Sequence, residues 1–193
     1  MAVGRDHTGR MFSTRELVLL ALFAGLVALS KIVLRVPIHV PGHSGMTWMA
    51  ILLVGRIVVR KPWAGTLMGL VSGIIAVAVV GGREGLLLWM KYLAPGMVMD
   101  LGALLSGERL DNPIVAMITA AAANAAKLIT SLIVSLALGI PVGYLALGLG
   151  LAATMHIVFG GLGGWLGALT VKTLQRAGLP HLPGPAEVRE ETI

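Results

Sequence analysis

Long apolar runs alternate along the chain with short clusters of charged residues, proline and glycine, and this pattern predicts membrane-spanning helices. The second run, of about 14 residues, is the shortest and barely covers a hydrocarbon core of ~30 Å. Pro113 opens the fifth run, at a first-turn position where its missing N–H costs nothing. The six runs cover residues 15–36, 46–59, 62–80, 84–105, 113–138 and 142–174.

The distribution of lysine and arginine predicts the orientation of these runs. If the N-terminus is inside, most basic residues lie on the cytoplasmic side, including Arg56, Arg60 and Lys61, and only Arg35 and Arg83 lie outside. Both termini are therefore expected to be cytoplasmic. We expect a cytoplasmic N-terminal segment over 1–13, a six-helix membrane domain over 14–176, and a disordered cytoplasmic tail over 177–193, which is proline-rich and charged.

Composition supports an integral membrane protein of the all-α class, a compact bundle of six transmembrane helices. The chain is 56% hydrophobic and 12% charged, and its mean hydropathy is +0.89. The formal net charge of +6 does not indicate nucleic-acid binding, because the basic residues punctuate apolar runs instead of gathering on a polar surface. Cysteine is absent, which excludes disulfides and thiolate metal sites.

Chargeable groups inside the apolar runs are the first candidates for function. Lys91, Lys127 and His156 lie well inside them, and a charged lysine at mid-membrane costs about 2.5–3.5 kcal/mol. Such a group needs a partner, a wet cavity or a ligand. Asp100 lies nearer the inner face, where we expect it to fix helix packing; by composition it is also the nearest candidate for a structural partner of Lys127.

A polar stripe supports a binding site on the fifth run. Asn124, Lys127, Ser131 and Ser135 follow one another at spacings of three, four and four, which places them on one helix face. We expect that face to look inward, toward other protein or water.

The outer loop VPIHVPGHSGM contains His39 and His43 among prolines and glycines that fix turns. It is interpreted either as a surface loop or as a lid over an outward cavity, in which His43 contacts the ligand. A metal site built from His39, His43 and His156 lacks a close-spaced ligand motif, so no metal is expected. No catalytic motif is present, which favours binding or transport over an enzyme.

Three stretches together resemble the S component of an energy-coupling factor (ECF) transporter, the small membrane subunit that captures a vitamin or related micronutrient. LALFAGLVALSK carries Ala21-xxx-Gly25 and Ala24-xxx-Ala28, similar to the small-residue pattern by which that family docks on its coupling partner. WMAILLVGRIVVRKPWAGTLMGLVSGIIA resembles the second and third spans, and KYLAPGMVMDLGALLSG resembles a helix of the thiamine-type members.

The resemblance implies a role for each matching residue. Lys91 occupies a position that is acidic in thiamine-type members, with Tyr92 beside it, so the reversed charge suggests an anionic ligand. Lys127 matches a basic position, and His156 falls near a polar ligand contact. The implied partners are a transmembrane coupling protein and two cytoplasmic ATPases in a prokaryotic plasma membrane; ATP is used by those subunits, and no cofactor is expected in this chain.

Two alternatives remain open. A nickel or cobalt S component relies on an N-terminal Met-His-Ile, whereas here MHI occurs internally, at Met155 to Ile157. A stand-alone proton-coupled carrier or channel would use Lys127, His156 and Asp100 as a relay.

Overall fold

The computed structural model describes residues 12–33, 43–80, 85–146 and 148–178, and these residues are helical with no strand among them. The predicted all-α class is thus confirmed. The elements are α1 (Thr14–Val33), α2 (Ser44–Val59), α3 (Ala64–Val80), the 3₁₀ helix η2 (Gly85–Trp89), α4 (Met90–Leu105), α5 (Pro113–Ala137), α6 (Val142–Ala146) and α7 (Leu149–Arg176).

Local capping chemistry explains where two of these helices begin. Ahead of α1, the Ser13 N–H donates to Glu16 Oε2 at 2.7 Å and the Glu16 N–H donates to Ser13 Oγ at 3.3 Å, which is a capping box. At α5 the side chain of Asn112 accepts from the Ile114 N–H at 2.9 Å, and Pro113 takes the first helical position as predicted.

The sixth apolar run differs from the prediction, because it forms two helices instead of one. The short α6 covers Val142–Ala146, and α7 begins only at Leu149. Between them Gly148 has a φ of +80°, a left-handed conformation that glycine adopts without steric cost and that ends a right-handed helix.

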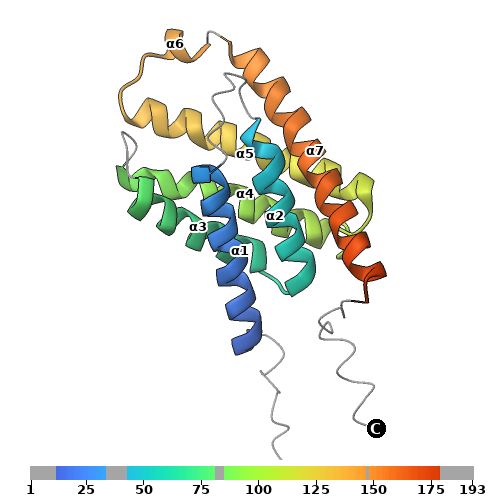
Figure 1. The fold of residues 1–193 in the computed structure, drawn as a ribbon. Coiled ribbons are helices and arrows are strands. Elements are labelled where there is room, and N and C mark those ends of the chain that lie inside the picture. The colour runs from blue at the N-terminus through green and yellow to red at the C-terminus, as the bar shows by residue number, and fades with distance from the viewer. Residues whose placement is uncertain (1–11, 34–42, 81–84, 147, 179–193) are drawn as a thin grey trace, which may run out of the picture.

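The long helices form two layers of three. One layer contains α1, α2 and α7, the other contains α3, α4 and α5, and the two sets run in different directions in Figure 1. Across the layers α1 packs on α3 and α7 packs on α5. The short helix α2 contacts α1, α3, α4, α5 and α7, so it occupies the centre of the bundle.

Glycines let these helices approach closely, and α7 shows this most clearly. A Cβ on Gly164 would collide with the backbone carbonyl of Ala116 on α5, and one on Gly160 would lie 2.7 Å from the carbonyl oxygen of Ala120. A second row of small residues on α7 faces α2, since a Cβ on Gly167 would lie 2.8 Å from Leu53 Cδ2. One helix therefore packs against two neighbours through two small-residue ridges.

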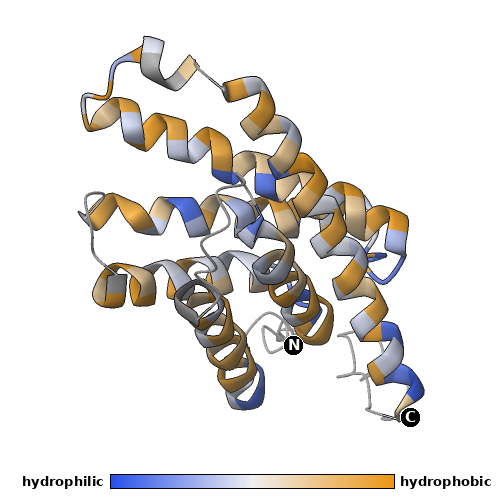
Figure 2. Cartoon of the chain, turned by 45° about the horizontal axis from the view of Figure 1, so that its top comes forward, coloured by the Kyte–Doolittle hydropathy of each residue, from blue (hydrophilic) through white to orange (hydrophobic). Residues whose placement is uncertain are grey.

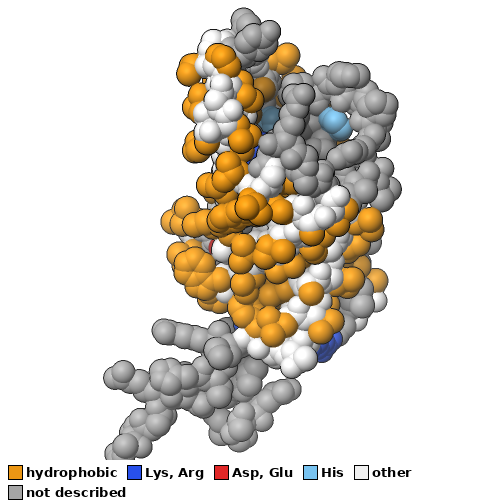
Figure 3. Space-filling view, turned by 90° about the vertical axis from the view of Figure 1, so that its left-hand side faces the viewer, with side chains coloured by type: hydrophobic (Ala, Val, Ile, Leu, Met, Phe, Trp, Pro, Cys, Tyr) orange, Lys and Arg blue, Asp and Glu red, His pale blue; other side chains and the backbone are white. Residues whose placement is uncertain are grey.

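Apolar side chains cover the outside of the bundle as well as its core. Hydrophobic residues dominate the helices in Figure 2, and a band of hydrophobic side chains crosses the face in Figure 3, with basic side chains at its lower end. Leu22 on α1, Leu104 on α4 and Ile118 on α5 are 57%, 73% and 66% exposed. By length and composition α5 and α7 can each cross a membrane, while Ser44–Val59 and Ala64–Val79 are shorter apolar helices.

Several sequence-based predictions lie outside the described residues. These are most of the N-terminal segment and of the tail, the loop that carries His39, and the outer connection over 81–83.

Candidate functional site

Trp48 on α2 is the centre of a cluster that joins three helices. Its ring is 1% exposed. Tyr92 from α4 lies beside it with ring centroids 5.9 Å apart, tilted by 54°. On another side the Lys127 ammonium from α5 lies 5.2 Å from the centroid of the Trp48 ring. A cation at this distance over an indole is attracted by the ring quadrupole, by about 0.5–2 kcal/mol depending on desolvation.

Asn124 extends this cluster toward α7. It lies one turn before Lys127 on α5, is fully buried, and donates from Nδ2 to the carbonyl oxygen of His156 at 2.8 Å. Its Oδ1 has no hydrogen-bond partner within the described residues. A buried acceptor left in this state costs free energy, so Asn124 is a site at which a donor group on a ligand would be stabilised.

The ring of His156 is fixed by its own helix. Nδ1 lies 2.8 Å from the Ala152 carbonyl oxygen. A carbonyl oxygen only accepts, so Nδ1 carries the proton in this contact, and Nε2 of the neutral ring is a hydrogen-bond acceptor. His156 is buried, and its backbone rather than its ring holds Asn124.

Lys91 and His43 lie near this end of the bundle, at the starts of α4 and α2. Lys91 is half-buried in the first turn of α4 and is rotated by about 100° from Tyr92 around the helix axis. His43 is half-buried just before α2, and its carbonyl accepts from the Met46 N–H at 3.2 Å. Of the sequence-predicted ligand residues, contacts link Tyr92, Asn124, Lys127 and His156 into one region, with Trp48 as the residue that the sequence did not single out.

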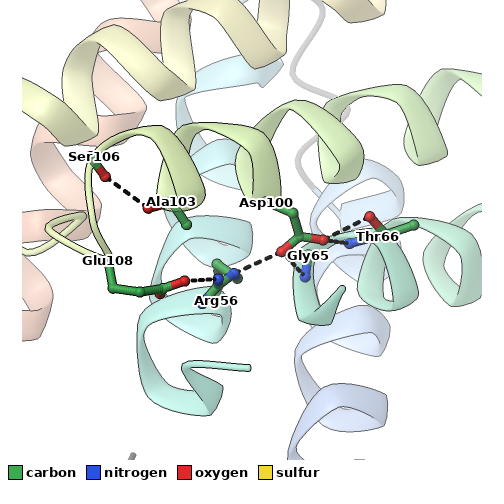
Figure 4. Close-up of polar contacts among 7 residues, drawn as sticks. All are labelled: Arg56, Gly65, Thr66, Asp100, Ala103, Ser106 and Glu108. Atoms are coloured by element: carbon green, nitrogen blue, oxygen red, sulfur yellow. Dashed lines mark hydrogen bonds and ion pairs between the residues drawn. The ribbon is translucent and has the colours of Figure 1, made fainter. Parts of the chain in front are cut away.

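A second polar cluster lies at the other end of α2 and α4, and Figure 4 shows its geometry. Arg56 is 1% exposed and donates from Nε to Asp100 Oδ1 and from Nη2 to Glu108 Oε1, both at 2.7 Å. Asp100 also accepts from the Gly65 N–H at 3.0 Å and from the Thr66 N–H and hydroxyl at 2.7 Å each. Its carboxylate therefore caps the N-terminus of α3 from the neighbouring helix α4, where an anion favours the helix dipole.

This cluster confirms the packing role of Asp100 and corrects its expected partner. Asp100 pairs with Arg56 and not with Lys127, which lies over Trp48 at the opposite end of α2. Arg56, which the sequence presents only as a marker of the cytoplasmic side, is an internal ion-pair residue.

The small residues of α1 divide into two faces. Ala24 and Ala28 are 0% and 3% exposed, and the Ala24 carbonyl oxygen accepts from Ser72 on α3 at 3.1 Å. These two alanines pack inside the chain, so in this conformation they do not offer a surface to a partner. Ala21 is exposed, and a Cβ on Gly25 would meet open space. The predicted docking surface therefore remains a prediction for Ala21 and Gly25.

Comparisons with protein-family models, with curated proteins and with solved structures found no match to this chain.

Proposed function

We propose that this protein is a multi-pass protein of a prokaryotic cell membrane, with its helices crossing the bilayer and both termini in the cytoplasm. The observation that supports this is the inverted distribution of polarity. Large apolar side chains are exposed on α1, α3, α4, α5 and α7, while Arg56, Asn124, Ser72 and His156 are buried. A water-soluble chain of this size rarely exposes apolar residues over so many outward faces.

Within that membrane we propose that the chain binds a small, vitamin-like micronutrient with an anionic group, as the S component of an ATP-driven ECF importer. The single observation that carries the ligand site is the position of Lys127, whose ammonium lies over the buried Trp48 ring, one helical turn after Asn124, whose Oδ1 has no hydrogen-bond partner within the described residues. An anionic group of a ligand bound beside this ammonium would be attracted to it, the more strongly where the packed helices exclude water. The amide oxygen would accept from an N–H or O–H of the same ligand.

The importer would also contain a transmembrane coupling protein and two cytoplasmic ATPases. Ala21 and Gly25 offer the small outward-facing positions at which another helix can approach α1 closely. The relay required by a stand-alone carrier loses support, because Asp100 is held by Arg56 and by the start of α3.

The test combines ligand identification with two measurements on one variant. Mass spectrometry of small molecules that co-purify with the protein supplies the ligand. Lys127→Met should then weaken its binding by roughly 2–5 kcal/mol, about 30-fold to several thousand-fold in Kd. The ligand-free melting temperature should fall by about 8 °C or less, because methionine can keep the apolar contact with Trp48 while the cation–π attraction of about 0.5–2 kcal/mol is lost.

Lys91→Met is the matched control, since Lys91 is half-buried like Lys127 and the change removes the same charge from a different helix, in the first turn of α4. We expect it to weaken binding less than Lys127→Met. Unchanged affinity combined with a markedly lower melting temperature in both variants would show that the lysines are structural, and would refute the anionic-ligand site.

A further inference from the structure

A groove opens beside the Arg56 cluster, on the outer surface of α4. Its volume is about 460 Å³. Met97, Leu101 and Leu104 form an apolar wall along α4 and are 49%, 52% and 73% exposed. Trp63, from the turn between α2 and α3, forms another wall and is 64% exposed. The groove is separate from the Trp48 cluster, which lies at the opposite end of α2.

The polar part of the groove carries an unusual set of charges. Arg56, Asp100 and Glu108 all line it, and one arginine with two carboxylates leaves a net charge of −1. Glu108 is the accessible member, with 44% of its side chain exposed. The Nη1 group of Arg56 has no hydrogen-bond partner within the described residues. The groove therefore presents an exposed carboxylate next to an apolar wall, and the guanidinium of Arg56 lies buried behind that carboxylate.

We propose that this groove binds a membrane phospholipid whose headgroup contains both a phosphate and a primary ammonium, that is, a phosphatidylethanolamine. The acyl chains would lie along Met97, Leu101 and Leu104. The ammonium would pair with Glu108, whose carboxylate is the accessible charge of the groove. Trp63 lies at the inner membrane interface in the orientation proposed above, at the depth where tryptophan lies beside lipid headgroups.

Charge distinguishes this occupant from a purely anionic lipid. A purely anionic lipid would bring its charge toward Asp100 and Glu108, which makes it the weaker ligand. The proposal rests on the membrane location proposed above, but it does not depend on any ligand at Trp48.

The test uses the full chain in nanodiscs that contain equal amounts of phosphatidylethanolamine, phosphatidylcholine and phosphatidylglycerol with identical acyl chains. Lipids that remain bound after release are identified by native mass spectrometry. We expect phosphatidylethanolamine to be retained above the other two. Glu108→Gln should reduce its retention about two- to fivefold, the effect of losing one partly exposed charge pair. Phosphatidylcholine, whose ammonium has no N–H, should be unaffected.

Two controls keep the result specific. Asp111→Asn removes a carboxylate from the same α4–α5 connection without touching the groove and should leave retention unchanged. Leu101→Trp fills the groove and should displace the lipid, while Leu86→Trp, on the exposed surface of η2, should not.

Equal retention of the three lipids, preference for phosphatidylglycerol, or no effect of Glu108→Gln would overturn the proposal. If the membrane location itself were wrong, the protein would appear in the soluble fraction before any lipid was measured.

Discussion

Asp100 offers the sharpest test of how the bundle is held together. Its side chain is 10% exposed and accepts four hydrogen bonds, from Arg56 Nε, the Gly65 N–H, the Thr66 N–H and the Thr66 hydroxyl. Asp100→Asn keeps the volume but removes the charge and turns one acceptor into a donor. Arg56 then remains buried with less compensation, and the start of α3 loses part of its cap.

The size of the effect follows from those contacts. Breaking a buried ion pair by removing one partner costs about 3–5 kcal/mol. Because asparagine keeps one oxygen, we expect about 3 kcal/mol. For a chain of this length each kcal/mol lowers the melting temperature by roughly 2–4 °C, so Asp100→Asn should lower it by about 6–12 °C.

The assay is thermal unfolding of the purified protein in detergent, followed by helical circular dichroism and by size-exclusion chromatography of heated samples. Glu108→Gln is the matched control, because it removes the second carboxylate from Arg56 at a position that is 44% exposed. Its cost should be about 1 kcal/mol or less. If the two variants melt at the same temperature, the buried contacts of the Asp100 carboxylate do not stabilise the bundle more than the exposed contact of Glu108 does.

Two further predictions concern helix packing and orientation. Gly164→Ala should destabilise the protein by about 1–3 kcal/mol, because its Cβ meets the backbone of α5, whereas Gly161→Ala, with 3.7 Å to its nearest neighbour, should be neutral or slightly stabilising in the same melting assay. In cells that carry single cysteines, a membrane-impermeant reagent should label Ser44→Cys and leave Ser106→Cys protected; the reverse pattern would contradict the proposed orientation.

The sequence predicted the helices well because their lengths and ends are local properties. A helix can form where an apolar run is bounded by proline, by basic pairs or by glycines, as at Pro113. The capping side chain of Asn112 then determines where α5 starts. The break at Gly148 was missed for a physical reason. Hydropathy reports what surrounds a residue and not its φ angle, and a glycine inside an apolar run is compatible with a continuous helix.

Tertiary pairings were harder to predict, since they join residues distant in sequence. Nothing in the spacing of Arg56 and Asp100 shows that they meet, and a tryptophan in an apolar run resembles any other core residue until Lys127 is found over its ring. Small-residue spacing identified close approach on α1 but could not tell an internal neighbour from an external one. Burial assigns Ala24 and Ala28 to the inside of the chain.

The Arg56 pairing also has a consequence for the order in which the protein is made. Arg56 lies in the last turn of α2, and its partner Asp100 follows 44 residues later. At a synthesis rate of about 5–20 residues per second, roughly 2–9 s pass before that carboxylate exists. In the orientation proposed above, the guanidinium can extend to the cytoplasmic interface during this interval, where the C-terminal helix dipole favours a cation. In that orientation the same side chain would first hold α2 at the cytoplasmic face, and would turn inward once α4 supplies Asp100.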